Sequence, residues 1–265
     1  NPKPAPDAPW QAIEASAAGR LGVAVLDTAD GSLQGHRLDE RFPMCSTFKW
    51  LAAAHVLARV DAGQERLDRR IHFSRDVLVT YSPATEKHAG RDGMTLAALC
   101  EAAITLSDNT AGNLLLESFG GPPGLTRYAR TLGDTMTRLD RWEPELNEAT
   151  PGDPRDTTTP RAMATALRAT LVGDALSASS RAQLVRWMEA TRTNLKRLRH
   201  ELPAGWRLGS KTGTGARGTT NDVGVYWPPG GAPIVVAVYP TEASADEAAR
   251  NAAVARVAHA VTGAG

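Results

Sequence analysis

The chain has 265 residues, 42% of them hydrophobic, and 30 Lys+Arg against 29 Asp+Glu give a net charge of +1. At about 150 residues per domain, this length corresponds to one or two domains with a full hydrophobic core. The chain has no basic stripe, no acidic tail and no apolar run near the roughly 18 residues of a membrane span, so neither nucleic acid nor a membrane is expected as a partner.

The beginning of the chain, NPKPAPDAPW at 1–10, is rich in proline and predicts a flexible arm. It contains no apolar segment led by Lys or Arg, which is compatible with a cytoplasmic protein or with the mature form of an exported one. The two cysteines, Cys45 and Cys100, allow at most one disulfide bridge. Cys100 lies in an apolar helical pattern, where a buried free thiol is expected.

The first predicted elements are an amphipathic helix at 7–18, an apolar strand at 19–27 and its hairpin partner at 32–39. From 45 to 62 the chain is apolar nearly all round, which predicts a helix buried on most faces. His55 falls inside this run, and we expect a core histidine with satisfied hydrogen bonds rather than a metal ligand.

The middle of the chain continues as helices. An apolar helix is predicted at 95–106, and a polar break at 107–109 separates it from another apolar helical run that two glycines end at 120–121. Residues 138–158 show no period and predict a long loop, a kind of segment that is usually functional or disordered. Two more helices are predicted, one beginning at 160 behind a threonine N-cap and one at 179–191.

The last elements are three strands and a helix, at 207–215, 221–229, 232–241 and 243–262. Strands thus lie at both ends and helices between them, which predicts an α/β fold of the α+β type. The strands of both ends form one antiparallel sheet with the terminal helices on one face. The expected subdomains are an α/β part, 1–40 with 192–265, and an inserted all-helical part, 41–191, with a cleft where they meet.

Two patterns suggest sites that the rest of the sequence does not support. None of the six histidines forms a short-spaced pair, so no zinc or iron site is expected. The stretch from Gly213 to Gly218 matches GxGxxG, but a dinucleotide site needs a helix after this motif, and here a strand is predicted. No metal and no cofactor is therefore expected.

A serine and a lysine lie one turn apart at the start of the buried helix. Ser46 and Lys49 have a spacing of three, which places both side chains on one helix face. A serine hydroxyl becomes a nucleophile when a base takes its proton, and a lysine serves as that base if burial disfavours its charged form. The alternative for this pair alone is a helix cap with a solvated lysine.

Two further polar motifs have chemical and structural interpretations. Ser107 and Asn109 flank Asp108 at the predicted break, where a hydroxyl can relay a proton and an amide can hold a substrate carbonyl; a capping turn is the alternative. Lys211 and Thr212 lie on a predicted strand just before a glycine that lets a ligand approach the backbone; a solvated strand lysine is the alternative.

S-x-x-K, S-D-N and K-T-G in this order form the signature of class A β-lactamases and penicillin-binding proteins. The run from Glu143 to Asn147, EPELN, also looks like the loop motif of the first family. The chain therefore resembles the class A serine β-lactamases over essentially its whole length.

The resemblance implies that Ser46 is the acylated nucleophile, which attacks the amide carbonyl of a β-lactam while the backbone N–H groups of Ser46 and Thr214 hold the oxyanion. Lys49 is implied as a base or proton relay. Glu143, with Asn147, is implied to hold the water that hydrolyses the acyl-enzyme. The family leaves open whether Lys49 or Glu143 takes the first proton.

The remaining implied roles concern the substrate. Ser107 delivers a proton to the ring nitrogen, and Asn109 binds the side-chain amide of the substrate. Lys211, Thr212 and Thr214 are implied to bind its carboxylate.

Two more residues are assigned by position in the family. Many relatives carry an arginine after the KTG strand to support the substrate carboxylate, whereas this chain has Thr220 there. Arg197 matches the position that another subset uses, so we assign it this role. Tyr81 resembles the aromatic residue at the mouth of the cleft, with a surface tyrosine before a proline turn as the alternative.

The resemblance also implies details of the loop and of the thiols. Arg141 and Asp156 match an ion pair that closes an Ω-loop at 141–156, and the Glu143–Pro144 bond is expected to be cis. The family's partner positions for Cys45 and Cys100 hold Gly215 and Ala53, so both thiols are expected to be free.

Two other classes share the serine and lysine chemistry: D-Ala-D-Ala peptidases and non-catalytic β-lactam sensor domains. Glu143 and Asn147 argue against both, because a positioned carboxylate beside a water makes release of the acyl group fast. The resemblance further implies an exported mature chain, periplasmic in a Gram-negative source. It acts on a small-molecule β-lactam as a monomer, without nucleic acid, membrane, metal or cofactor.

Overall fold

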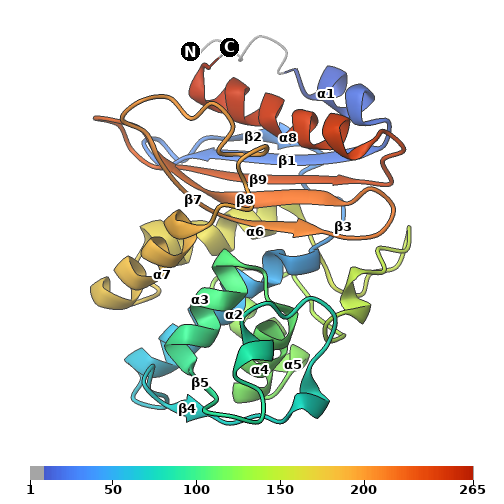
Figure 1. The fold of residues 1–265 in the computed structure, drawn as a ribbon. Coiled ribbons are helices and arrows are strands. Elements are labelled where there is room, and N and C mark those ends of the chain that lie inside the picture. The colour runs from blue at the N-terminus through green and yellow to red at the C-terminus, as the bar shows by residue number, and fades with distance from the viewer. Residues whose placement is uncertain (1–8, 265) are drawn as a thin grey trace.

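The computed structural model of the protein describes residues 9–264. Most of the proline-rich arm expected at 1–10 therefore lies outside the described residues. In Figure 1, helices α1 (Trp10–Ala17) and α8 (Glu247–Thr262) cover one face of a sheet, and the other helices lie below its opposite face. No helix within 9–264 is long and apolar enough to cross a membrane.

The sheet joins the two ends of the chain. Its five strands are all antiparallel and follow the order β2-β1-β9-β8-β7. Their bounds are Arg20–Asp27 for β1, Leu33–His36 for β2, Arg207–Thr214 for β7, Thr220–Trp227 for β8 and Ile234–Thr241 for β9. Strand β1 pairs with β9 along its whole length, from Arg20 opposite Thr241 to Asp27 opposite Ile234. The predicted single antiparallel sheet is thus confirmed.

Hydrophobic residues pack on both faces of this sheet, in two separate clusters. On one face Ile13 of α1 and Val254 and Val257 of α8 pack against the strands. On the other face Val223 and Val225 of β8 belong to the cluster that continues into the helical part. Because both faces are covered, strands β1, β7, β8 and β9 are buried along most of their length, whereas the edge strand β2 is partly exposed.

The helical part is built around α2, whose apolar side chains are buried on nearly all sides. The helices of this part are α2 (Phe48–Asp61), α3 (Leu96–Thr105), α4 (Asn109–Ser118), α5 (Pro122–Thr131), α6 (Pro160–Leu167) and α7 (Ala178–Ala190). Short 3₁₀ turns lie at Cys45–Thr47, Arg75–Val77, Thr85–Lys87 and Glu145–Asn147, and a π-helical turn at Arg168–Val172 follows α6. The predicted threonine cap is confirmed, because the N–H of Ala162 donates to Thr159 Oγ1 at 3.1 Å.

Two features of the helical part escape the sequence patterns. Helix α5 begins with two prolines after two glycines, a composition typical of a loop, although proline is well tolerated in the first turn of a helix. Two pairs of two-residue strands also occur here, too short to produce an alternating pattern. They are β3 (Phe42–Pro43) with β6 (Thr157–Thr158), and β4 (Arg70–Ile71) with β5 (Met94–Thr95).

The expectation for His55 is wrong in one respect. Its ring packs against Phe119 and Tyr128, with centroid distances of 4.3 and 4.5 Å, but its Nδ1 has no hydrogen-bond partner. Burial lowers the pKa of His55 to about 4, so the ring is neutral at pH 7. The thiols follow the prediction, since Cys45 and Cys100 are both buried and free.

Candidate active site

Ser46 lies at the junction between the 3₁₀ turn Cys45–Thr47 and helix α2, so the helix expected at 45–62 begins as two segments. The spacing of three still brings its hydroxyl to Lys49, with 2.9 Å between Nζ and Oγ. Ser46 is 8% exposed and Lys49 is fully buried. The nucleophile candidate thus faces solvent while its partner is kept from water.

The ammonium group of Lys49 uses all its hydrogens within the protein. Besides Ser46 Oγ, it donates to the carbonyl of Ser107 at 2.8 Å and to Asn109 Oδ1 at 2.7 Å. A Cβ on Gly112 of α4 would lie 3.0 Å from Lys49 Cε, so this glycine makes room for the side chain. Burial lowers the pKa of Lys49, and the Glu143 carboxylate, 3.6 Å away, partly opposes this shift.

Ser107 occupies the break between α3 and α4 with a left-handed backbone, at φ 58°. Its hydroxyl oxygen accepts from Lys49 Nζ at 3.3 Å and from Lys211 Nζ at 3.0 Å. The longer contact with Lys49 shares a hydrogen that this lysine gives to a closer acceptor, so Lys211 is the main donor, and the hydroxyl hydrogen of Ser107 is free to donate to another group. Lys211 is fully buried, and burial together with the charge of Lys49 holds its pKa well below the ordinary value.

Asp108, between the two predicted site residues of this motif, forms the cap that was the alternative interpretation of this motif in the sequence. Its buried carboxylate accepts from the backbone N–H groups of Ala111, Ala84 and Thr85, each at 2.9 Å. The bond from Ala111 caps α4. The bonds from Ala84 and Thr85 connect the segment after Tyr81 to the break between α3 and α4. The carboxylate thereby fixes the position of Ser107.

Glu143 is buried beneath the cleft, with 2% exposure. Its Oε2 accepts from Asn147 Nδ2 at 2.7 Å, whereas its Oε1 and the Oδ1 of Asn147 have no hydrogen-bond partner among residues 9–264. Asn113 of α4 holds the Glu143 backbone from both sides, accepting from its N–H at 2.9 Å and donating to its carbonyl at 3.1 Å. Asn113 gives no signal in the sequence, since it is one polar residue on a helix.

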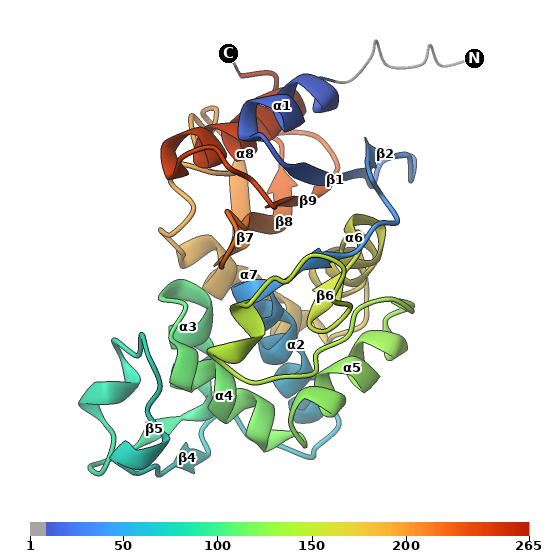
Figure 2. The same ribbon diagram turned by 90° about the vertical axis from the view of Figure 1, so that its right-hand side faces the viewer.

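The loop that carries Glu143 is closed at its neck as the resemblance implied. Asp156 Oδ2 accepts from Arg141 Nε at 2.7 Å, and its Oδ1 accepts from the backbone N–H groups of Asp140 and Arg141. The Glu143–Pro144 bond is cis. In Figure 2 the loop, in yellow-green, passes in front of the helices of the lower part and leads to β6.

Strand β7 runs close beside the nucleophile. A Cβ on Gly213 would lie 2.8 Å from the carbonyl oxygen of Met44 and 3.0 Å from the backbone nitrogen of Ser46, so only glycine permits this approach. The backbone of the following residue, Thr214, is thereby brought to the side of the cleft that holds Ser46.

Arg197 closes the end of this strand. Its guanidinium donates to Thr214 Oγ1 at 2.8 Å and to the carbonyl of Asn221 at 2.9 Å, and its Nε donates to Asn251 of α8 at 2.9 Å. Burial lowers its pKa, but a guanidinium keeps its charge in proteins. Thr220 stands where many relatives carry the arginine, and its hydroxyl accepts a hydrogen bond from Arg250 Nε at 3.1 Å.

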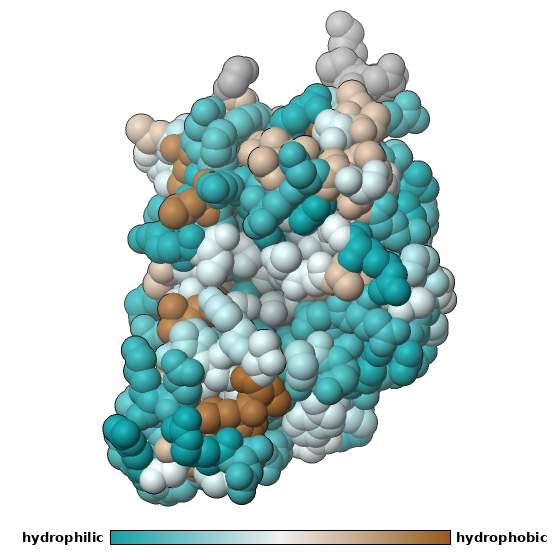
Figure 3. Space-filling model, turned by 45° about the vertical axis from the view of Figure 1, so that its right-hand side comes forward, coloured by the Kyte–Doolittle hydropathy of each residue, from teal (hydrophilic) through white to brown (hydrophobic). Residues whose placement is uncertain are grey.

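These residues surround a cleft of about 340 Å³. Its lining comprises Ser46, Tyr81, Ser107, Asn109, Asn147, Thr193, Arg197, Thr212, Gly213 and Thr214. The other predicted site residues, Lys49, Glu143 and Lys211, are buried and do not line it. Figure 3 shows this face hollowed between the sheet above and the helices below, with a surface of near-neutral hydropathy.

Two residues at the rim complete the cleft. Tyr81 is 59% exposed and has a left-handed backbone. Thr193, which sequence reasoning missed, lies 2.8 Å from Thr212 through their hydroxyl oxygens. Its segment, TRTN, has no feature that distinguishes a site threonine from a surface one.

The fold and the serine–lysine cleft define an enzyme that acts by acyl transfer. The model of the beta-lactamase enzyme family matches residues 7–264. Beta-lactamase AST-1 of Nocardia asteroides is 50% identical over 249 residues, which cover 94% of this chain and 80% of that protein.

Solved structures agree with this match. An ancestral class A β-lactamase is 65% identical with a TM-score of 0.94, over 96% of this chain and 98% of its own. A putative class A β-lactamase, PenP of Rhodopseudomonas palustris, is 63% identical with a TM-score of 0.94, over 96% and 97% of the two chains. The chain belongs to the beta-lactamase enzyme family and is a class A β-lactamase, which hydrolyses β-lactams through a serine acyl-enzyme.

Proposed function

We propose that Ser46 attacks the amide carbonyl of the β-lactam and becomes acylated. The hydrogen bond from Lys49 to its oxygen, at 2.9 Å, supports this role, since it supplies a path for the proton. A lysine with a lowered pKa gives up its own proton more readily, and Glu143 at 3.6 Å is the nearest carboxylate to receive it. Lys49 and Glu143 both remain candidates for the acylation base.

In this proposal the backbone N–H groups of Ser46 and Thr214 stabilise the negative oxygen that develops on the attacked carbonyl. Ser107 then delivers a proton to the ring nitrogen, which leaves. The bond from Lys211 to Ser107 Oγ supports this step, because it leaves the hydroxyl hydrogen free to donate and polarises the hydroxyl.

The substrate carboxylate is proposed to bind at the end of β7, to Lys211, Thr212 and Thr214, with Arg197 beside them. The bond from Arg197 to Thr214 Oγ1 supports this position for the guanidinium. Two further residues contact the remainder of the substrate in this proposal. Asn109 binds its side-chain amide, and Tyr81 packs against it at the mouth of the cleft.

Hydrolysis of the acyl-enzyme is assigned to Glu143 and Asn147. Buried polar atoms almost always have hydrogen-bond partners, and here Glu143 Oε1 and Asn147 Oδ1 have none in the protein. A water that donates to both oxygens would lie beside the acylated serine, with Glu143 as its general base. This pair of unpartnered acceptors is the observation that carries the proposal.

The proposed cycle of acylation and hydrolysis is tested by mixing the protein with benzylpenicillin in large molar excess. The loss of the lactam absorbance measures its hydrolysis. We expect sustained turnover of many equivalents, with no turnover by Ser46→Ala. A burst of about one equivalent that then stops would mean a trapped acyl-enzyme, and would favour a penicillin-binding protein or a sensor domain.

We also infer that the protein is exported, because β-lactams act on targets outside the cytoplasm. We further propose that it acts as a monomer. It is periplasmic if the source is Gram-negative. The division into 1–40 with 192–265 and 41–191 is kept as our proposal for its subdomains. It is supported by the sheet on one side of the cleft and the helices on the other.

A further inference from the structure

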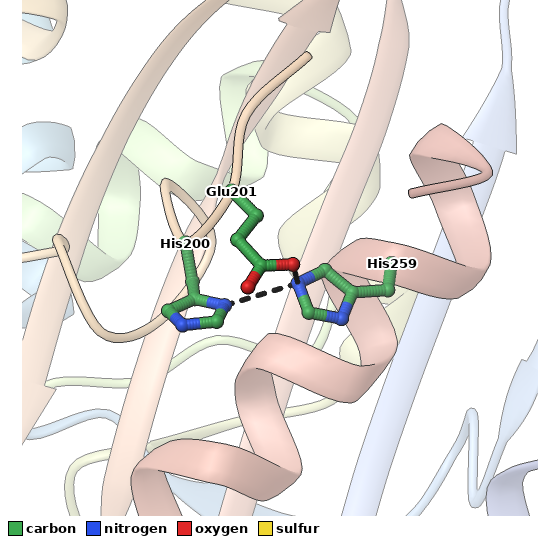
Figure 4. A group of neighbouring side chains, drawn as sticks. All are labelled: His200, Glu201 and His259. Carbon is green, nitrogen blue, oxygen red and sulfur yellow. Dashed lines mark hydrogen bonds and ion pairs between the residues drawn. The ribbon is translucent and has the colours of Figure 1, made fainter. Parts of the chain in front are cut away.

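Two imidazole rings that lie 59 residues apart in the sequence meet between the segment before β7 and the last turns of α8 (Figure 4). His200 Nδ1 lies 3.0 Å from His259 Nε2, and Glu201 Oε2 lies 3.7 Å from the same nitrogen. The three ligand atoms all lie within 4.8 Å of one another. This His200–Glu201–His259 cluster has no part in the proposed β-lactam chemistry.

The backbone on both sides of the cluster is held by hydrogen bonds. The N–H of His200 donates to the carbonyl of Arg197 at 3.0 Å, and the carbonyl of His259 accepts from Gly263 N–H at 2.8 Å. The side chain of His259 is 21% exposed and that of Glu201 is 62% exposed. The backbone that carries the two rings is thus held in place, and the exposed carboxylate leaves the cluster open to solvent.

The facing nitrogens are suited to share a metal ion. A neutral imidazole has one donor and one acceptor nitrogen, so two ring nitrogens at 3.0 Å share one hydrogen. When a metal ion takes the place of this hydrogen, the ring that carried it adopts its other tautomer, so each facing nitrogen offers a lone pair and both imidazoles stay neutral. The carboxylate of Glu201 then offsets part of the charge of the ion.

The donor set selects the kind of ion. Two imidazole nitrogens suit Zn²⁺, Cu²⁺ and Ni²⁺, whereas Mg²⁺ and Ca²⁺ prefer oxygen ligands. Two histidines and a glutamate with a fourth position open to solvent is a donor set that Zn²⁺ uses in proteins. We propose that His200, Glu201 and His259 form a binding site for a divalent transition-metal ion, with Zn²⁺ as the best fit.

Such an ion joins two segments that also hold Arg197. This arginine precedes His200 by one turn, and its Nε donates to Asn251 of α8, the helix that carries His259. An ion bound by the cluster therefore cross-links the two segments from outside the cleft. Since it binds the native arrangement, it stabilises the folded protein.

The test is calorimetric titration of the untagged, chelator-treated protein with ZnCl₂ and, separately, with MgCl₂. We expect about one Zn²⁺ per chain and no heat of binding with Mg²⁺. His259→Gln and His200→Gln should each lower the Zn²⁺ affinity more than about tenfold, because loss of a direct ligand costs at least as much as loss of an outer-shell partner.

The matched control is His88→Gln. Like His259 and Glu201, His88 pairs with a carboxylate, with 2.9 Å between His88 Nδ1 and Asp92 Oδ1. Both side chains are exposed, and no second imidazole of the described residues joins them. Zn²⁺ should raise the melting temperature of the wild type and of His88→Gln, and leave that of His259→Gln unchanged.

The metal-free melting temperatures report whether each variant folds, independently of binding. A folded wild type that takes up no Zn²⁺ would overturn the proposal, as would wild-type affinity in both folded histidine variants. Neither readout involves a β-lactam, so the result does not depend on the proposed catalytic roles.

Discussion

Two buried carboxylates lie in the same loop, one at its neck and one at its turn, and they differ in how completely they are hydrogen bonded. At the neck, Asp156 accepts from Arg141 and from two backbone N–H groups. At the turn, Glu143 has one oxygen bonded to Asn147, and the other has no hydrogen bond within 9–264, only the Lys49 ammonium 3.6 Å away. A carboxylate that is fully bonded can only hold structure, whereas one with a free acceptor can also bind a water or move a proton.

A third buried carboxylate shows that an unpartnered oxygen alone does not define a catalytic group. Asp222 of β8 has no partner for its Oδ1, but it does not line the cleft. Burial raises its pKa to about 6, against the opposing charges of Arg197 and Lys211. A buried carboxylate is therefore a candidate for catalysis only if it both has an oxygen without a hydrogen bond and lies beside Ser46.

The largest effect is expected for Glu143→Ala. Acylation by benzylpenicillin should persist, while hydrolysis of the acyl-enzyme slows by about 10²–10⁴, the usual contribution of a general base. Mass spectrometry after mixing should show a lasting adduct of one opened penicillin. Glu145→Ala, an exposed carboxylate of the same loop, is the control, and wild-type turnover by Glu143→Ala would remove Glu143 from the mechanism.

At the neck, Asp156→Ala should act first on stability. It removes the acceptor of two backbone N–H groups and leaves the mostly buried Arg141 with only the half-exposed Glu148 as partner, at a cost of about 3 kcal/mol in the free energy of unfolding. We expect a looser loop and slower deacylation, but a smaller loss than with Glu143→Ala. Urea unfolding measures the first effect and acyl-enzyme lifetime the second.

The control for the neck is Asp153→Ala, which removes the partner of the half-exposed Arg155. Surface pairs contribute little, so its unfolding curve should match that of the wild type. An ordered loop and an unchanged deacylation rate in Asp156→Ala would contradict the role of the neck.

The effect of Asp222→Asn on turnover is expected to be the smallest of the three, and its effect on stability depends on pH. The pKa of Asp222 is raised from its ordinary value of 3.8 to about 6, so the native carboxyl keeps a proton that the unfolded chain has lost. Its contribution to stability is therefore complete below about pH 4 and falls by about 3 kcal/mol as pH rises through 6.

Urea unfolding of both proteins at pH 4, 5, 6 and 7 measures this effect. The asparagine resembles the neutral acid, so the difference in stability between variant and wild type should grow in favour of the variant as pH rises. A difference that does not vary with pH would mean that Asp222 ionises as readily in the folded protein as in the unfolded chain.

Local sequence signals were enough wherever partners are close along the chain. The contact between Ser46 and Lys49 follows from a spacing of three at the start of a helix, and the cap at Thr159 follows from its residue type. Strong periodicity likewise located the strands at both ends. Helix α5 was missed because glycines and prolines hid its beginning, and the short strands β3 to β6 because two residues cannot show alternation.

The rest of the site depends on partners that are distant in sequence. Ser107 and Lys211 meet across 104 residues, which no spacing rule reveals; the family resemblance supplied the connection. Asn113 and Thr193 were missed because asparagine and threonine are common on any polar surface. No short-spaced pair marked His200 and His259 in the sequence, although folding brings the two rings to 3.0 Å.

By itself, the sequence determined the α+β class and the sheet made from both ends, while its motifs, through the family resemblance, supplied the free thiols and the roles proposed for Ser46, Lys49 and Glu143. These depend on periodicity, composition and motifs, which are local properties of the chain. Only the tertiary structure decided which polar atoms are buried, which keep a free acceptor and which meet across the cleft. Burial and hydrogen-bond satisfaction are properties of a whole environment, so they exist only once distant segments have packed together.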